Sequence, residues 1–128
     1  MEARLVERAK VPFKTIPAAG VHGVGLKTLP GNVIRLARGF FAARRILYEF
    51  KPEVLFFTGG YVAVPMALAG MRVPTALYVP DIEPALALKT LARFADKIAV
   101  TAQDSFRYFS RRERLVLTGY PTRADLAR

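Results

Sequence analysis

Apolar and polar positions follow two alternating patterns along the chain. Short apolar runs typical of buried strands alternate with longer segments in which apolar residues recur at helical spacing. The runs that predict strands are residues 13–17, 54–57, 75–79, 97–101 and 115–117. The segments that predict helices are 2–9, 30–50, 61–71 and 84–94, with a short helical turn at 104–109. Strands alternating with helices predict an α/β fold: a Rossmann-like parallel sheet with right-handed crossovers, flanked by helices.

The stretch from 51 to 65, KPEVLFFTGGYVAVP, lies at the centre of this pattern. Its uninterrupted apolar run at 54–57 predicts a strand buried on both faces of the sheet. Gly59, Gly60 and Tyr61 follow directly and lead into the next helix. Glycine leaves the backbone N–H groups accessible, which suits a phosphate at the start of a helix. Paired glycines after a strand also simply close a tight turn, so both interpretations stay open.

Three turns follow strands of the predicted sheet. Ligands of parallel sheets bind outside the carboxyl ends of the strands, so these turns are expected to share one edge. The second turn also begins a helix, with acidic residues and Pro84 expected in its first turn. The three turns are Gly59-Gly60-Tyr61, Pro80-Asp81-Ile82-Glu83 and Tyr120-Pro121-Thr122-Arg123.

The segment 30–50 is the clearest helix, and it carries two apolar groups. One stripe consists of Leu36, Phe40, Ala43, Leu47 and Phe50. A second group lies beside arginines, and it can be either a broad core face with a solvated basic edge or a surface that docks on anionic lipid. For the second interpretation the predicted membrane-docking residues are Ile34, Arg38, Phe40, Phe41 and Arg45.

Composition limits the possible functions. The 128 residues make one domain or part of a larger one, and 52% are hydrophobic. Cysteine is absent and His22 is the only histidine, so disulfides and thiolate or His-rich metal sites are excluded, and no cofactor is expected. A net charge of +10 favours an anionic partner: nucleic acid, a membrane surface or phosphorylated substrates. Arginines at 111, 112 and 114 form a basic cluster near the end.

Two further features bear on membranes and secretion. The start, MEARLVERAK, is charged and has no apolar core, so we do not expect it to be a signal peptide. Residues 54–71 carry no charge, but Gly59, Gly60 and Pro65 interrupt them, so a strand, turn and helix explain them better than a membrane span.

The chain resembles the MurG family of bacterial glycosyltransferases. The likeness begins with a helix similar to the family's MEADLVP segment at Met1 and continues through GVGLK at 23–27. It includes the strand that starts at Lys51-Pro52-Glu53-Val54 and the turn Gly59-Gly60-Tyr61-Val62. It closes at Gly119-Tyr120-Pro121-Thr122-Arg123, similar to the family's G-N-P-V-R. The combination is specific, although no single piece is.

The resemblance implies a fold and roles for particular residues. Residues 1–128 would be part of the N-terminal, acceptor-side half of a two-domain GT-B enzyme. Gly59, Gly60 and Tyr61 match a glycine-rich loop assigned to the acceptor diphosphate, and Arg123 matches an arginine associated with the nucleotide sugar. Asp81 occupies the place of the asparagine in the family's H-E-Q-N, here Tyr78-Val79-Pro80-Asp81. Aspartate lacks the amide donor and repels phosphate, which allows a different sugar or acceptor.

The implied reaction is transfer of N-acetylglucosamine from UDP-GlcNAc to undecaprenyl-diphospho-muramoylpentapeptide in peptidoglycan synthesis, at the cytoplasmic face of the cell membrane as a peripheral protein. In the family, the first glycine-rich loop with its histidine precedes the matched region, and the donor domain follows it. We therefore expect no catalytic residue in these 128 positions and no turnover by them alone; His22 sits in a glycine-rich loop and does not match that histidine.

Two alternatives remain open at this point. The first is a non-catalytic, membrane-bound subunit that binds the acceptor and needs a separate donor domain. The second is a basic nucleic-acid-binding domain, which the charge favours. The basic residues are scattered over several elements, however, and no nucleic-acid-binding signature is found. No nucleic acid is therefore expected as a partner.

Overall fold

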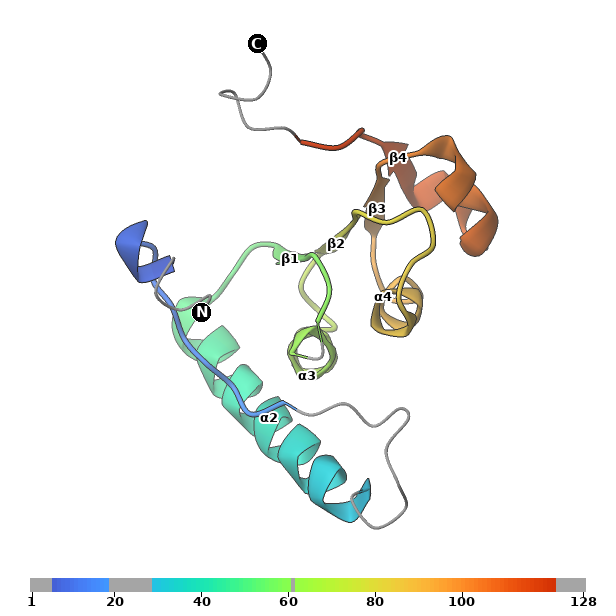
Figure 1. The fold of residues 1–128 in the computed structure, drawn as a ribbon. Coiled ribbons are helices and arrows are strands. Elements are labelled where there is room, and N and C mark those ends of the chain that lie inside the picture. Colours follow the sequence, from blue (N-terminus) through green and yellow to red (C-terminus); the bar gives the residue numbers. More distant parts are fainter. Residues whose placement is uncertain (1–5, 19–28, 61, 122–128) are drawn as a thin grey trace.

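Four parallel strands form a single sheet in the order β1-β2-β3-β4 (Figure 1). The computed structural model describes residues 6–18, 29–60 and 62–121. The strands are β1 (Leu55–Phe57), β2 (Thr75–Val79), β3 (Lys97–Val100) and β4 (Leu115–Leu117). These four strands and their parallel pairing confirm the predicted α/β class. The strand predicted at 13–17 is wrong, because residues 11–18 have no regular secondary structure and pair with no strand among the described residues.

Helices precede or connect the strands. They are α2 (Leu29–Phe50), α3 (Ala63–Ala69), α4 (Leu86–Leu91) and the short 3₁₀ helices η1 (Gln103–Tyr108) and η2 (Arg112–Arg114). In Figure 1, α3 and α4 lie beneath the same face of the sheet, and α2 packs against the outer side of α3. Strands added in one direction through crossovers of one hand place their helices on one face in this way.

The core fills the space between the sheet and these helices. Alternate strand residues point toward α3 and α4 and are buried. The buried apolar strand residues are Leu55, Phe57, Leu77, Val79, Ile98 and Val100. They pack with Ala63 and Ala67 of α3 and with Leu88 and Leu91 of α4.

The opposite face of the sheet corrects the expectation for residues 54–57. Phe56 is 61% exposed, although the residues on either side of it are buried. Ala76, Tyr78 and Ala99 on the same face are only half-buried. Because α3 and α4 both cover the other face, no described helix reaches this one. The apolar run therefore forms a strand that this structure buries on one face only.

The start of α4 also differs from the prediction. The helix begins at Leu86, and its N-cap residue Ala85 makes no side-chain capping bond. Ala85 is extended, with ψ 157°, so Pro84 precedes the helix instead of lying in its first turn. Asp81 and Glu83 consequently belong to an exposed loop after β2.

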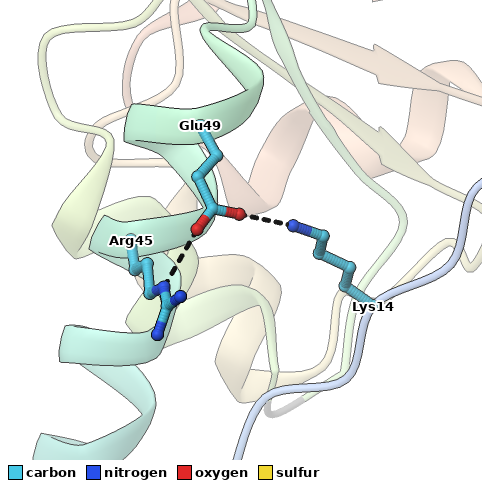
Figure 2. A network of polar contacts seen from close by, with 3 residues as sticks. All are labelled: Lys14, Arg45 and Glu49. Atoms are coloured by element: carbon cyan, nitrogen blue, oxygen red, sulfur yellow. Dashed lines mark hydrogen bonds and ion pairs between the residues drawn. The ribbon is translucent and has the colours of Figure 1, made fainter.

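Residues 11–18 cross over α2 and are attached to it at two places. Gly39 of α2 is buried, and a Cβ there would overlap the carbonyl oxygen of Pro17. Further along α2, the Glu49 carboxylate accepts a hydrogen bond from Lys14 Nζ at 2.6 Å and from Arg45 Nε at 2.9 Å (Figure 2). These two contacts hold the crossing segment against the helix.

Glu49 should make the attachment sensitive to acid. The hydrogen bonds from Lys14 and then Arg45 lower the pKa of this carboxyl. A carboxyl whose pKa is lowered by folding stabilises the folded state at every pH above its unfolded-state pKa. This stabilisation is lost as the pH falls through the pKa of the carboxyl in the folded state. We therefore expect Glu49→Gln to increase the ¹⁵N-relaxation mobility of residues 13–16 at pH 7. The difference from wild type should disappear at acidic pH.

The control for this prediction is Glu83→Gln, which removes a similarly exposed ion pair, that of Glu83 with Lys89. It should leave residues 13–16 unchanged at both pH values. Equal mobility in wild type and Glu49→Gln at pH 7 would show that the ion pair does not hold this segment.

Candidate functional site

The carboxyl ends of the four strands gather several turns at one edge of the sheet. Because the strands are parallel, the segments after β1, β2 and β4 leave the sheet at this edge. They are residues 58–60, 80–83 and 118–120. Tyr61 and Arg123, which were predicted to contact the acceptor and the donor, lie outside the described residues. The structure thus brings Gly59 and Gly60 to the same edge as Asp81.

The turn after β1 needs glycine at two consecutive positions. Gly59 has φ +125° and Gly60 has φ +84°, values that side chains with a Cβ rarely adopt. Gly60 is exposed, and a Cβ there would meet no atom within 4 Å. Gly59 is half-buried and rests near Leu88 of α4. Within the described residues neither glycine N–H has a hydrogen-bond acceptor. The turn can therefore offer backbone donors to a ligand.

The turn after β2 is attached to its neighbours by two side-chain contacts. The Thr101 hydroxyl, just after β3, donates to the carbonyl oxygen of Pro80 at 3.0 Å. Lys89 of α4 pairs with Glu83 at 3.2 Å. Asp81 is exposed and makes no ion pair with any described residue. Its negative charge at this edge would act against a phosphate placed directly beside it.

Two tyrosines complete the edge, and the sequence did not single them out as a pair. The Tyr78 hydroxyl is buried with no hydrogen-bond partner among the described residues. Its burial, and to a lesser extent neighbouring Tyr120, raise the pKa of Tyr78. Tyr120 itself is 68% exposed. Both belong to motifs compared with the family, but their closeness depends on the pairing of strands and could not be predicted from the sequence.

The predicted membrane-docking residues lie on α2, and four of the five are exposed. Ile34, Arg38, Phe41 and Arg45 recur at spacings of four, three and four residues, so they share one helix face. Ile34 is 61% exposed and Phe41 is 68% exposed. Phe40 differs: it is half-buried, and its ring meets the edge of Phe41 with centroids 5.6 Å apart.

The same spacing extends this face by one residue that sequence reasoning missed. Tyr48 follows Arg45 by three positions and is 80% exposed. Arg45 itself donates to Glu49, so Arg38 is the more available cation of the two. We call Ile34, Arg38, Phe41, Arg45 and Tyr48 the α2 stripe. None of the described helices is long and apolar enough to cross a membrane.

The described part of the chain contains no cluster of potential metal ligands. No three His, Cys, Asp or Glu side chains of that part gather closely enough to hold a metal ion. At this edge a ligand can reach a pair of backbone N–H groups, an exposed carboxylate and the exposed phenol of Tyr120, while the Tyr78 hydroxyl is buried. That set can bind and orient a ligand.

Comparison with known families identifies the domain. Residues 1–100 match the glycosyltransferase family 28 N-terminal domain. Two curated relatives are each named UDP-N-acetylglucosamine--N-acetylmuramyl-(pentapeptide) pyrophosphoryl-undecaprenol N-acetylglucosamine transferase. One, from Roseiflexus sp. (strain RS-1), is 41% identical over 146 residues, and the other, from Desulforamulus reducens, is 35% identical over 130 residues. In both cases the alignment includes 98% of this chain, which spans about a third of the relative: 33% and 34%.

A solved structure shows the same fold. The crystal structure of Acinetobacter baumannii MurG superimposes with a TM-score of 0.74 at 20% sequence identity. The match covers 100% of this chain and 36% of that one. The parallel sheet with its flanking helices is thus a Rossmann-like arrangement found within a larger enzyme.

Proposed function

Because the chain belongs to the glycosyltransferase family 28 N-terminal domain family, we propose that it is the acceptor-binding and membrane-binding part of a glycosyltransferase. The proposed reaction transfers N-acetylglucosamine from UDP-GlcNAc to undecaprenyl-diphospho-muramoylpentapeptide in peptidoglycan synthesis. The names of the relatives support both the sugar and the lipid-linked acceptor. The protein acts as a peripheral protein at the cytoplasmic face of the cell membrane.

The glycine turn after β1 is the proposed contact for the acceptor diphosphate. Its support is geometric: Gly59 and Gly60 offer N–H groups without acceptors among the described residues, at an edge open to solvent. Hydrogen bonds from backbone N–H groups to an anionic oxygen are roughly twice as strong as neutral ones. Such donors hold the diphosphate and stabilise the charge on it. Tyr61 is proposed to extend this contact.

The α2 stripe is the proposed membrane contact. Its apolar members, Ile34, Phe41 and Tyr48, would enter the interface between head groups and acyl chains, while Arg38 and Arg45 meet anionic head groups. Phe40, which is half-buried, would support Phe41 from beside it instead of entering the lipid. The net charge of +10 acts in the same direction, because both the membrane and the acceptor are anionic.

Only two residues are proposed to contact the sugar donor. Asp81 and Arg123 are proposed to approach the nucleotide sugar. Arg123 would supply a positive charge for its phosphates, and exposed Asp81 would accept hydrogen bonds from hydroxyl groups of the sugar. A carboxylate is an acceptor only, so it suits a hydroxyl better than a carbonyl oxygen or a phosphate.

Ligand binding by the 128-residue chain tests the division of roles. We expect the chain to bind an undecaprenyl-diphospho-sugar acceptor in detergent micelles and to bind UDP-GlcNAc weakly or undetectably. Sugar transfer should not be measurable, because no general base is assigned within these residues. Tight binding of UDP-GlcNAc without binding of the acceptor would reverse the assignment and contradict the proposal.

A further inference from the structure

A second concave site lies away from the glycine turn, between α4 and the connection from η1 to β4. The cavity has a volume of about 430 Å³. Its apolar floor is formed by Ala92, Ile98 and Phe109, which are all buried. In Figure 1, α3 separates α4 from α2, so this pocket is not part of the α2 stripe.

The rim of the pocket is strongly basic. Lys89, Arg93 and Arg111 line it, and no acidic side chain does. Arg93 and Arg111 are exposed, and their guanidinium groups make no hydrogen bond or ion pair with any described residue. Like charges that share a concavity raise each other's free energy, and a bound anion would relieve that repulsion. The two free guanidinium groups are therefore available to a ligand.

Other basic residues nearby have structural contacts, which distinguishes them from the two free ones. Arg114 donates to the carbonyl oxygen of Ala95 at 2.6 Å. Arg107 lies 4.9 Å from the centre of the Tyr108 ring and donates to its hydroxyl at 3.0 Å. Lys89 pairs with Glu83, which does not line the pocket, and lies 5.2 Å from the same ring centre. Glu83 and Tyr108 thus both help to fix the position of Lys89 at the rim, and its charge is already partly balanced by Glu83.

We propose that this pocket binds a phosphate group, carried either by a soluble phosphate ester or by an anionic lipid head group. Planar guanidinium groups form paired hydrogen bonds with phosphate oxygens. Arg93, just after α4, and Arg111, between η1 and η2, both line the cavity. The basic residues line one local concavity and not an extended stripe, which is the form expected for a single phosphate and not for a nucleic-acid backbone. This site goes beyond the proposed function and does not depend on it.

The test is a titration of the intact 128-residue chain with inorganic phosphate, in which NMR detects binding. We expect saturable shifts of the Arg93 and Arg111 Nε–H signals and of the Ser110 amide. The variant Arg93→Gln/Arg111→Gln should bind phosphate about a hundredfold more weakly, about tenfold for each guanidinium group removed. Because both side chains are exposed and unpaired among the described residues, its melting temperature should stay close to that of wild type.

A charge-matched control distinguishes specific phosphate binding in the pocket from general attraction of phosphate to a basic protein. Arg44→Gln/Arg72→Gln removes two exposed arginines outside the pocket and should bind phosphate as wild type does. Equal weakening in the two double variants, or no saturable shift of the pocket signals, would overturn the proposal.

Vesicles distinguish the two sources of phosphate. With phosphatidylcholine vesicles containing phosphatidic acid, a lipid head group as ligand predicts weaker binding of Arg93→Gln/Arg111→Gln and competition by free phosphate. A soluble ester as ligand predicts unchanged vesicle binding while the variant still loses inorganic phosphate. Both results support a phosphate site and identify its source.

Discussion

Replacing one apolar and one basic residue of the α2 stripe should abolish most binding to anionic vesicles. The variant Phe41→Asp/Arg38→Glu removes an exposed aromatic ring and reverses the charge of the more available cation. Burial of a phenylalanine in an apolar phase is worth about 1.5–3 kcal/mol. Each basic residue near an anionic surface adds about 1 kcal/mol, so reversing one costs about twice that. We expect affinity for vesicles containing anionic lipid to fall by about a hundredfold or more.

Arg38 is a better target than Arg45 for this experiment. Arg45 donates to Glu49, which also holds Lys14, so changing it would disturb the segment that crosses α2. The matched control is Met71→Asp/Arg72→Glu in the turn after α3, which makes the same change of charge at exposed positions outside the stripe. Co-sedimentation should show the control close to wild type. If both variants lose binding equally, net charge and not the stripe attracts the protein to the membrane.

Substitution of Gly60 by valine should weaken diphosphate binding by about tenfold to a hundredfold. Gly60 has φ +84°, and a β-branched side chain is strongly disfavoured there, so the turn must change its backbone conformation. The N–H groups of the turn would then no longer converge. A hydrogen bond to a charged group contributes about 1.5–3 kcal/mol, which sets the expected factor. Titration calorimetry with a short-chain prenyl diphosphate measures it.

Gly119 provides a control with the same kind of backbone strain. It has φ +71° in the segment after β4, and a Cβ there, as at Gly60, would meet no atom within 4 Å. Gly119→Val should therefore cost a similar amount of stability while leaving diphosphate affinity unchanged. The interpretation fails if Gly119→Val weakens binding as much as Gly60→Val, because the loss would then follow from general destabilisation.

Structural features that depend on residues close together in the sequence were predicted well. The strands β2 and β4 begin and end where their apolar runs do, and α2 spans the segment predicted from its spacing. The turn at Gly59 and Gly60 was also predicted, because a buried strand followed by two glycines leaves few other conformations. The parallel pairing of the strands followed from the alternation of strands and helices.

Features that depend on contacts between distant segments were not predicted. Residues 13–17 have the composition of a strand, but they cross α2 at Gly39 and do not join the sheet. Phe56 is apolar on a face that no described helix covers, and its environment is decided by which side the crossovers take. The basic pocket combines α4 with the start of the segment before β4, which are separated in the sequence by β3 and η1, so no local pattern indicates it.

The proposed diphosphate contact at the glycine turn is the central claim, and an NMR titration of the ¹⁵N-labelled chain with a short-chain prenyl diphosphate tests it most directly. We predict that the amide signals of Gly59 and Gly60 shift in a saturable way, because their N–H groups donate to the ligand. Those shifts should be absent in Gly60→Val and retained in Gly119→Val. A ligand that binds but shifts other residues, leaving the Gly59 and Gly60 amides unchanged, would contradict the account.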